Sequence, residues 1–294
     1  MDRSSVLTVE LQYRKNTYEG YRCHVLWHRK NKLGDVTEMR TRKMAELTWP
    51  EIKDAVEQNA GVILPIGATE QHGPHLPLCT DATLAHELAL AVAEPLNMIV
   101  APTVSYGYRS RPTTGGGQTF IGTTSLRGQT LMDMVEDVIN EFIRHGFKRI
   151  VLLNWHFENS NFIYESAFLA TEKYKQTHPD LKIMIMELPF QTFSEETMAK
   201  IFPQGFPGWG IEHASIFETS LMLYLHPELV LFERAVDDSA EYYPWYDLLP
   251  IPSKIVAPSG TLWKATQAST EKGELAWKEL VPMVIEKISF ELPL

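Results

Sequence analysis

The sequence predicts an α/β fold, a three-layer α/β/α sandwich in which a mostly parallel sheet lies between two layers of helices. Short apolar runs alternate along the chain with longer segments whose apolar residues recur at helical spacing. Such alternation is typical of parallel strands joined by covering helices. Hydrophobic residues make up 44% of the 294 residues and charged residues 22%, which supplies a core and excludes wholesale disorder.

The elements follow one another regularly from residue 45. Thr48 precedes Glu51 by three residues, with Pro50 in the first turn, which predicts a helix start. Apolar runs predict strands at 61–67, 98–104, 148–154 and 182–188, and helical periodicity predicts helices at 81–96, 131–146, 159–174, 213–226 and 270–290.

Two long loops interrupt this order. The loop 105–126 contains three consecutive glycines, but neither the GxGxxG nor the GxxxxGK[ST] spacing of a nucleotide loop. We therefore expect the glycines to let the backbone approach a ligand or a neighbouring subunit. The proline-rich segment 244–258 is interpreted as an ordered wrapping loop, because only a short stretch of chain follows it.

Residues 1–44 differ in composition from the remainder. They hold ten Lys and Arg against five Asp and Glu, whereas the remaining 250 residues carry a net charge of −15. They also show no sustained apolar period. We predict a loosely attached basic N-terminal extension at 1–44, and one domain at 45–294.

Overall charge and cysteine content exclude several classes of protein. A net charge of −10 argues against nucleic-acid binding, which depends on neutralising phosphates. No apolar run reaches the roughly 18 residues of a membrane span, and the N-terminus lacks the apolar core of a signal peptide. Two cysteines are too few for a disulfide framework. We expect a cytoplasmic protein without nucleic-acid or membrane partners.

Two Glu/His pairs follow two of the predicted strands. Glu70 and His72 come after the first strand, and His156 and Glu158 after the third. Residues i and i+2 of an extended segment point the same way, and ligands bind where parallel strands end. Asp81, at a predicted helix start, adds a third carboxylate. The pairs are thus expected to face one another across a cleft, although a single such pair could equally cap a helix.

The charge of this cluster favours metal ions. Three carboxylates close together must partly protonate or separate unless cations balance them. Imidazole and carboxylate ligands suit Zn²⁺ and Mn²⁺. We therefore expect two divalent metals per chain, with the ligands Glu70, His72, Asp81, His156 and Glu158.

A further histidine follows a segment rich in proline and glycine. His213 stands at a predicted helix start, close to Trp209. A histidine in that position has a lowered pKa and can move protons near neutrality. On the residues alone, a buried or capping histidine is an equally good interpretation.

Five segments together resemble the creatininase (creatinine amidohydrolase) family. They are LPIGATEQHGPHLPLCTDATL, YGYRSRPTTGGGQTFIGTTSL, LLNWHFENSNFIYE, GFPGWGIEHASIFETSLML and APSGTLWKATQASTEKGEL, in the family's order over most of 45–294. The resemblance implies an α/β/α sandwich, usually a homohexamer, in which a hydroxide bridging two metals opens a cyclic amide. Glu70 and His156 would hold one metal, His72 and Glu158 the other, and Asp81 would bridge them, with zinc and manganese as the metals.

The resemblance also implies roles in proton transfer and substrate binding. It makes His213 the proton shuttle, and we expect Glu158, as a ligated carboxylate beside the attacking water, to accept the water's proton while His213 protonates the departing nitrogen. Trp209 would line the substrate pocket. Several pocket positions depart from the pattern: Thr114 for serine, Trp155 for glycine, Phe157 for tyrosine, Phe190 for a tryptophan and Gly210 for aspartate.

These departures affect the expected substrate more than the expected chemistry. Thr114, Phe157, Trp209, Gly210 and His213 are the predicted substrate contacts, and Trp155 would crowd the pocket beside His156. Lost polar contacts usually change specificity strongly. We therefore expect an amidohydrolase for creatinine or a related small amide, with creatinine itself a poor substrate. The alternatives are a family amidase or deformylase with another substrate, and a non-catalytic metal-binding assembly module, which the intact set of five ligands disfavours.

Overall fold

The computed structural model describes residues 10–14, 22–26, 39–187 and 193–294, which form two compact units, 1–40 and 41–294. In the first unit, β1 (Glu10–Arg14) and β2 (Arg22–Leu26) pair as an antiparallel hairpin with Tyr13 opposite Cys23. This hairpin was not predicted from the sequence. Strands of five residues with charges at their ends are too short for a periodicity argument to detect.

The second unit begins four residues before the predicted boundary at residue 45. The backbone N–H of Val100 donates to the carbonyl of Arg42 at 2.7 Å, and Lys43 forms a parallel bridge with the same valine. Arg42 and Lys43 therefore add to the edge of the sheet. Composition alone placed them with the basic extension.

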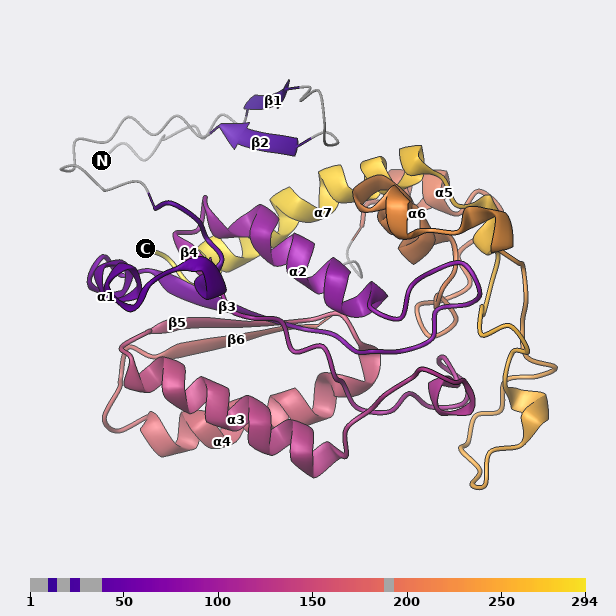
Figure 1. Ribbon diagram of the computed structural model, residues 1–294, viewed down its shortest axis with the longest axis horizontal. Helices are drawn as coiled ribbons and strands as arrows, with labels where there is room; N and C mark the ends of the chain where they lie inside the picture. Colours follow the sequence, from indigo (N-terminus) through magenta and orange to yellow (C-terminus); the bar gives the residue numbers. More distant parts are fainter. Residues whose placement is uncertain (1–9, 15–21, 27–38, 188–192) are drawn as a thin grey trace. The chain divides into compact units, whose positions relative to one another are not determined.

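A four-stranded, fully parallel sheet forms the centre of this unit (Figure 1). Its strands are β3 (Gly61–Ile66), β4 (Met98–Val100), β5 (Arg149–Asn154) and β6 (Lys182–Glu187), in the order β4-β3-β5-β6. Ile66 pairs with Asn154 in the register of β3 and β5. The chain segments that follow these two strands therefore leave the sheet at the same level, and the α/β prediction is confirmed.

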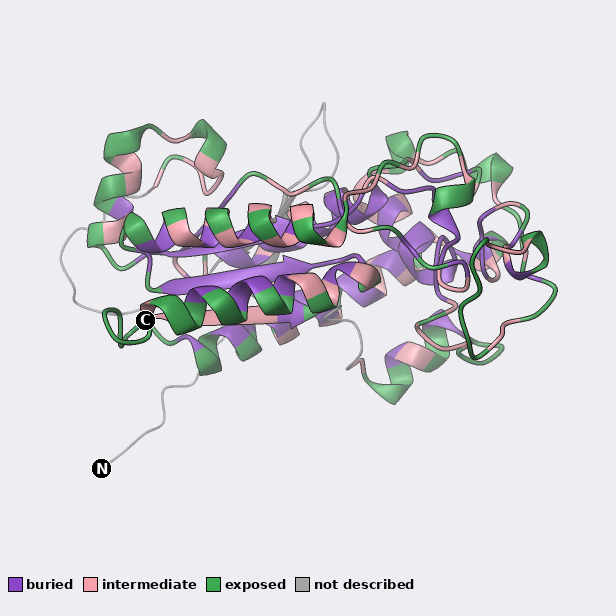
Figure 2. Ribbon diagram, turned by 90° about the horizontal axis from the view of Figure 1, so that it is seen from below, coloured by how far each residue is buried: buried purple, intermediate pink, exposed green. Residues whose placement is uncertain are grey.

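The burial of the strands explains their continuous apolar sequences. Every residue of β3, β4 and β5 is buried, as Figure 2 shows for the purple strands between the helical layers. β4 is shorter than the predicted strand 98–104, because Pro102 has no N–H to donate to a neighbouring strand. The run resumes at Val104, which forms a single parallel bridge with Ile66.

Helices cover both faces of the sheet (Figure 1). On one side lie α2 (Thr80–Ala93), α6 (Ile216–Leu225) and α7 (Thr270–Glu291), and on the other α3 (Gly128–Arg144) and α4 (Ser160–Tyr174). The chain also contains α1 (Trp49–Glu57), α5 (Glu195–Ile201) and the 3₁₀ turns Met44–Glu46, Gly117–Thr119, Phe157–Asn159, Pro227–Leu229, Phe232–Arg234, Ser253–Ile255 and Ala265–Gln267.

The helix ends mostly follow the expected signals. The N–H of Thr48 donates to the Glu51 carboxylate at 2.7 Å, which completes the predicted capping box of α1. The short helix α5 was not predicted, although the Ser194 side chain caps it. α6 begins at Ile216 rather than at the predicted residue 213, because Ala214 has a left-handed backbone conformation. None of the helices among the described residues combines the length and the apolar composition that a membrane span requires.

Candidate metal centre

The residues predicted to bind metal converge where β3 and β5 end. Nδ1 of His156 lies 3.1 Å from Oε2 of Glu70 and 3.2 Å from Oδ2 of Asp81. Glu70 follows β3, His156 follows β5, and Asp81 is in the first turn of α2. All three are buried and together form a group of side chains with the spacing of metal ligands.

Asp81 lies between the two histidines. Its Oδ1 is 3.1 Å from Nε2 of His72, while its Oδ2 faces Nδ1 of His156. One carboxylate thus contacts an imidazole on each side. This is the arrangement required of a carboxylate that bridges two ions.

Backbone carbonyls orient both imidazole rings. Nε2 of His156 lies 2.8 Å from the carbonyl oxygen of Tyr108, and Nδ1 of His72 lies 3.1 Å from that of Glu70. If these nitrogens carry the ring protons, Nδ1 of His156 and Nε2 of His72 keep their lone pairs toward Asp81. Metal-ligating histidines characteristically donate their other N–H to such a partner.

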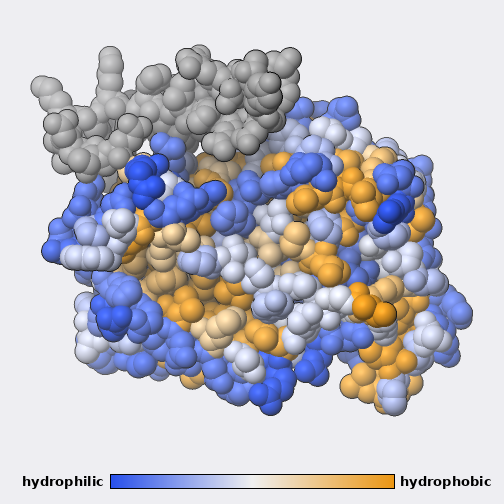
Figure 3. All heavy atoms as spheres, in the orientation of Figure 1, coloured by the Kyte–Doolittle hydropathy of each residue, from blue (hydrophilic) through white to orange (hydrophobic). Residues whose placement is uncertain are grey.

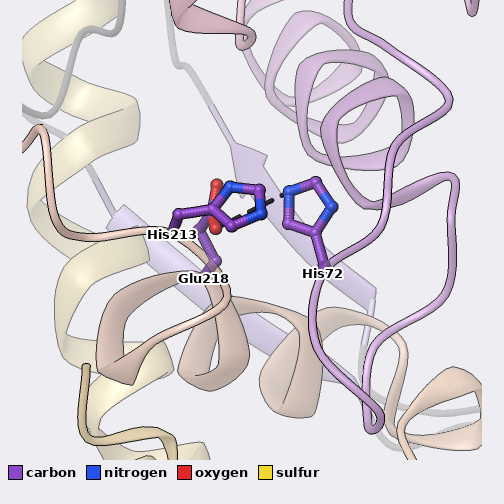
Figure 4. A group of neighbouring side chains, drawn as sticks. All are labelled: His72, His213 and Glu218. Carbon is purple, nitrogen blue, oxygen red and sulfur yellow. Dashed lines mark ion pairs between the residues drawn. The ribbon is translucent and has the colours of Figure 1, made fainter. Parts of the chain in front are cut away.

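Glu218 is a functional candidate that the sequence analysis missed. Its Oε2 lies 3.7 Å from Nε2 of His72, and Figure 4 shows His72, His213 and Glu218 converging from a loop, the segment before α6 and α6 itself. One signal was present in the sequence. Glu218 is the only acidic residue of α6, whose first seven residues are all buried.

The segment that carries His213 and Glu218 is tightly folded. Oε2 of Glu218 accepts from the N–H of Ala214 at 2.8 Å, and Oε1 of Glu212 accepts from the N–H of Phe217 at 2.7 Å. Ala214 has a φ of +52°, a left-handed conformation that is costly for alanine. The helix therefore cannot begin at 213 as predicted, and the strained turn places His213 over the cluster.

Glu158 does not lie where the expected ligand assignment requires it. It is the carboxylate of Glu218 that neighbours His72, whereas Oε2 of Glu158 lies 3.5 Å from Nε2 of His156. Oε1 of Glu158 accepts from the N–H of Arg111 at 3.0 Å and from the Thr114 hydroxyl. The 3₁₀ turn that follows His156 carries Glu158 to the far side of that ring.

The glycine triplet packs against the cluster. A Cβ on Gly115 would lie 2.6 Å from Oε1 of Glu70, and one on Gly117 would lie 2.7 Å from the same atom. The glycines therefore let the loop 105–126 approach the Glu70 carboxylate. The expected approach to a ligand or a neighbouring subunit stays a prediction.

The donor set fits divalent metals. Among the described residues, buried atoms without a hydrogen-bond partner include Oε1 of Glu70, Nε2 of His72 and Oδ2 of Asp81. Leaving buried polar atoms unpaired is costly, and metal coordination would satisfy these. The mixture of carboxylate and imidazole is typical of zinc and manganese sites.

The carboxylates also control the protonation of the rings. Burial by itself lowers the pKa of His72, but Asp81 and Glu218 raise it to about 10. Glu70 and Asp81 likewise raise the pKa of His156 well above its usual value despite burial. Without cations, both rings would hold protons that balance the carboxylates. Divalent ions would displace these protons.

His213 behaves differently from the other two histidines. Burial, together with the charge on the neighbouring His72, lowers its pKa to about 4. The two ring centroids are 4.4 Å apart. Its ring is therefore neutral near pH 7, which is consistent with a group that receives and returns a proton.

Some of the predicted substrate contacts are accessible to solvent, and others are not. Phe157 is 51% exposed, Gly210 is exposed and Trp209 is partly exposed, so these three are accessible. Thr114 instead bonds to Glu158. Phe190 lies outside the described residues.

Trp155 does not line a pocket, contrary to expectation. Its side chain is only 2% exposed, and its ring stacks on Phe217 with the planes 5° apart and the centroids 6.4 Å apart. Successive residues of an extended segment point to opposite sides, so a buried Trp155 accompanies an inward-facing His156. The tryptophan belongs to the core behind the metal centre.

Comparisons with known proteins agree with this arrangement. A family model described as "Creatininase: Creatinine amidohydrolase" matches residues 45–288. The "Creatinine amidohydrolase" of Pseudomonas putida is 42% identical over 253 residues, covering 85% of this chain and 97% of that protein. A "Mycofactocin precursor peptide peptidase" of Mycolicibacterium smegmatis is 30% identical over 240 residues, covering 77% and 83% respectively.

Solved structures share the fold. One described as "Creatininase Mn" has a TM-score of 0.83 and 40% identity, covering 87% of this chain and 100% of that chain. A creatininase variant described as "Zn-Zn type" has the same TM-score and coverage at 39% identity. These structures confirm the fold class, and they support divalent metals at the two groups of candidate ligands.

Proposed function

The chain belongs to the creatininase family, and from that premise we propose that it is an amidohydrolase that uses two divalent metals to open a small cyclic amide. The observation that carries this proposal is the position of Asp81, whose two oxygens lie 3.1 Å from Nε2 of His72 and 3.2 Å from Nδ1 of His156. A buried carboxylate between two imidazoles, each oriented by a backbone carbonyl, supports a binuclear site.

The ligands divide into two sets that share Asp81. Glu70 and His156 would hold one metal, and His72 would hold the other together with Glu218 rather than Glu158. Zn²⁺ and Mn²⁺ fit both sets. When bound, such ions lower the pKa of water and polarise the amide carbonyl.

Glu158 and His213 move the protons. Glu158 lies on the Nε2 side of the His156 ring, away from Glu70 and Asp81. Its Oε1 accepts from the Thr114 hydroxyl and from the N–H of Arg111, and these two bonds fix the orientation of its carboxylate. It accepts the proton of the attacking water. That proton then passes to His213, which is buried and neutral until it receives it, and His213 gives it to the departing nitrogen.

The proposed substrate is creatinine or a related small cyclic amide. The 42% identity to a protein named creatinine amidohydrolase supports this class. Because Trp155 is buried, the steric argument against creatinine is removed, and Phe157 and Gly210 remain as departures that face solvent. A second candidate is a peptide amide, which the 30% identity to a precursor peptide peptidase favours.

Metal removal and a substrate panel test the proposal. We expect about two metals per chain by elemental analysis, loss of activity on chelation, and recovery with Zn²⁺ or Mn²⁺. Creatinine, other cyclic ureas and imides, formamides and short peptides form the panel, with linear esters as the control. A metal-free protein that keeps full activity would overturn the proposal. Metal binding without hydrolysis of any panel member would favour the assembly module.

The proposal also includes a homo-oligomer, a hexamer by the resemblance to the family. Trp245 is 95% exposed, Leu249 76% and Ile121 fully exposed, which is unusual for side chains of this size. Figure 3 shows apolar surface on the segment that projects at the lower right. Light scattering during size-exclusion chromatography measures the molecular mass of the assembly and hence its number of chains. A monomer at micromolar concentration would contradict this part of the proposal.

A further inference from the structure

Gln71 lies between two candidate ligands but makes a separate set of contacts. Its side chain is 5% exposed, and its Nε2 donates to the carbonyl oxygens of Gly115 at 2.7 Å and Gly260 at 3.1 Å. Its Oε1 accepts from the N–H of Gly73 at 2.9 Å. All three partners are backbone groups, so they determine which end of the amide is nitrogen.

The backbone at Gly260 packs directly against the side-chain amide of Gln71. Gly260 has a φ of +83°, and a Cβ at that position would lie 1.8 Å from Oε1 of Gln71. No other residue could occupy the position without displacing the glutamine side chain. The segment around Gly260 is therefore matched to Gln71.

The same residue contacts the ring of His213. Nε2 of His213 lies 2.9 Å from the backbone oxygen of Gln71 and 3.0 Å from its Nε2. The amide nitrogen has two protons, and the carbonyls of Gly115 and Gly260 accept both. All of these groups are satisfied together only if His213 carries its proton on Nε2 and donates it to the oxygen of Gln71.

We propose that Gln71 is a positioning residue, which holds His213 as the Nε2–H tautomer and leaves Nδ1 as the nitrogen that exchanges protons with the substrate. The inference deepens the proposed function and rests on it. The proton that Glu158 takes from the attacking water passes to Nδ1 and leaves from Nδ1 to the departing nitrogen, while Nε2 keeps its own proton throughout. Charge and proton number are therefore restored after each turnover.

Gln71 also connects segments that are remote in sequence. Through its amide it links the metal-ligand segment to Gly115 in the loop 105–126 and to Gly260 before α7, and through its backbone oxygen to His213. Loss of the Gln71 side-chain amide would leave the carbonyls of Gly115 and Gly260 unpaired beside the His213 ring. Nε2 of His213 would then be drawn toward those carbonyls, and Nδ1 would turn away from its working position.

Imidazole ¹⁵N spectra of the zinc-loaded protein test the tautomer directly. In the unmodified protein we expect His213, assigned by its absence in His213→Asn, to show a protonated Nε2 and an unprotonated Nδ1. A proton on Nδ1, or rapid exchange between the tautomers, would overturn the inference. This result does not depend on identifying a substrate. If no amide is hydrolysed, the proposed function fails while the spectrum still decides the inference.

Gln71→Leu tests the positioning role, with Thr123→Val as the matched control. Leucine has a similar volume but no donors, whereas Thr123→Val removes only the hydrogen bond from the backbone N–H of Gln71, 2.9 Å long. For Gln71→Leu we expect kcat to fall about tenfold or more, a fraction of a full acid–base contribution. KM and zinc content should stay close to those of the unmodified protein, and the His213 signals should shift. The control should change none of these.

Equal kcat and equal spectra in Gln71→Leu and Thr123→Val would overturn the positioning role. If Gln71→Leu does not fold, Gly260→Ala replaces it, because its Cβ must displace the Gln71 amide. The same loss of kcat and the same shift of the His213 signals are expected from that variant. An unchanged spectrum in folded Gly260→Ala would contradict the inference.

Discussion

The two halves of the candidate metal centre are built in different ways. Glu70, Asp81 and His156 come from the ends of two neighbouring parallel strands and the first turn of the next helix. The other half joins His72 to Glu218 and His213, which lie more than 130 residues further along the chain. Spacing in the sequence was enough to predict that Glu70, Asp81 and His156 lie together. The second half depends on how α6 packs against α7 and α2.

Separate substitutions of Glu218 and Glu158 by glutamine test which of the two is a metal ligand, and they have the largest expected effect. Glu218→Gln should lose about one of two metals per chain, because it removes a charged ligand beside His72. Glu158→Gln should keep both metals and lower kcat by about 10² to 10⁴, the usual size of a general-base contribution. Elemental analysis and steady-state kinetics give both quantities. The reverse pattern of metal loss would return Glu158 to the ligand set.

The affinity for zinc should depend steeply on pH in both halves. Burial lowers the pKa of His72, but Asp81 and Glu218 raise it to about 10, and the pKa of His156 is raised for a similar reason. A metal needs the neutral imidazole, so binding below that pKa releases a proton. Apparent affinity should therefore rise with pH, about tenfold per unit for each proton released. Calorimetry in buffers of different ionisation enthalpy counts the protons, and a count of zero would contradict the ligand roles.

His213→Ala distinguishes a proton carrier from a third ligand in the second half. Because the pKa of His213 is lowered by burial and by the nearby His72, its neutral ring is suited to proton transfer. We expect kcat to fall by roughly 10² with two metals still bound. A loss of one metal in this variant would instead make His213 a ligand.

Thr114 should act through Glu158 rather than through substrate. Its hydroxyl bonds to Oε1 of that glutamate, so Thr114→Val should lower kcat about 10- to 100-fold with little change in KM. Thr114→Ser keeps a hydroxyl and is the matched control. An increase in KM alone would show that the side chain contacts substrate, as the sequence analysis expected.

Trp155 and Phe157 compare the buried and exposed sides of the segment that carries His156. Trp155→Ala should destabilise the protein by about 3 to 5 kcal/mol, because it empties a core position stacked on Phe217. Phe157→Ala, at a half-exposed position, should cost about 0.5 kcal/mol. Denaturant titrations measure both. A gain in creatinine turnover for folded Trp155→Ala would place the tryptophan in the pocket after all.

Local patterns in the sequence determined most of the fold and the first half of the site. Continuous apolar runs predicted the four strands of the sheet, and the capping box at Thr48 and Glu51 predicted the start of α1. The Glu/His pairs at 70–72 and 156–158 could be assigned to one edge, because parallel strands end together. These inferences succeed because periodicity and capping act over a few residues.

Tertiary structure alone decided the positions of Glu218, Glu158 and Trp155. Glu218 reaches His72 because a strained turn at Ala214 begins α6 beside the loop after β3. Glu158 turns away from His72 because a 3₁₀ turn follows His156, and that turn is stabilised by hydrogen bonds to a distant loop. Trp155 is buried because His156 points into the candidate metal centre, so the preceding side chain points to the opposite side, into the core. Each outcome depends on which distant segment fills the neighbouring space, and residue type and spacing do not specify that segment, even where a lone glutamate in an apolar helix marks Glu218 as unusual.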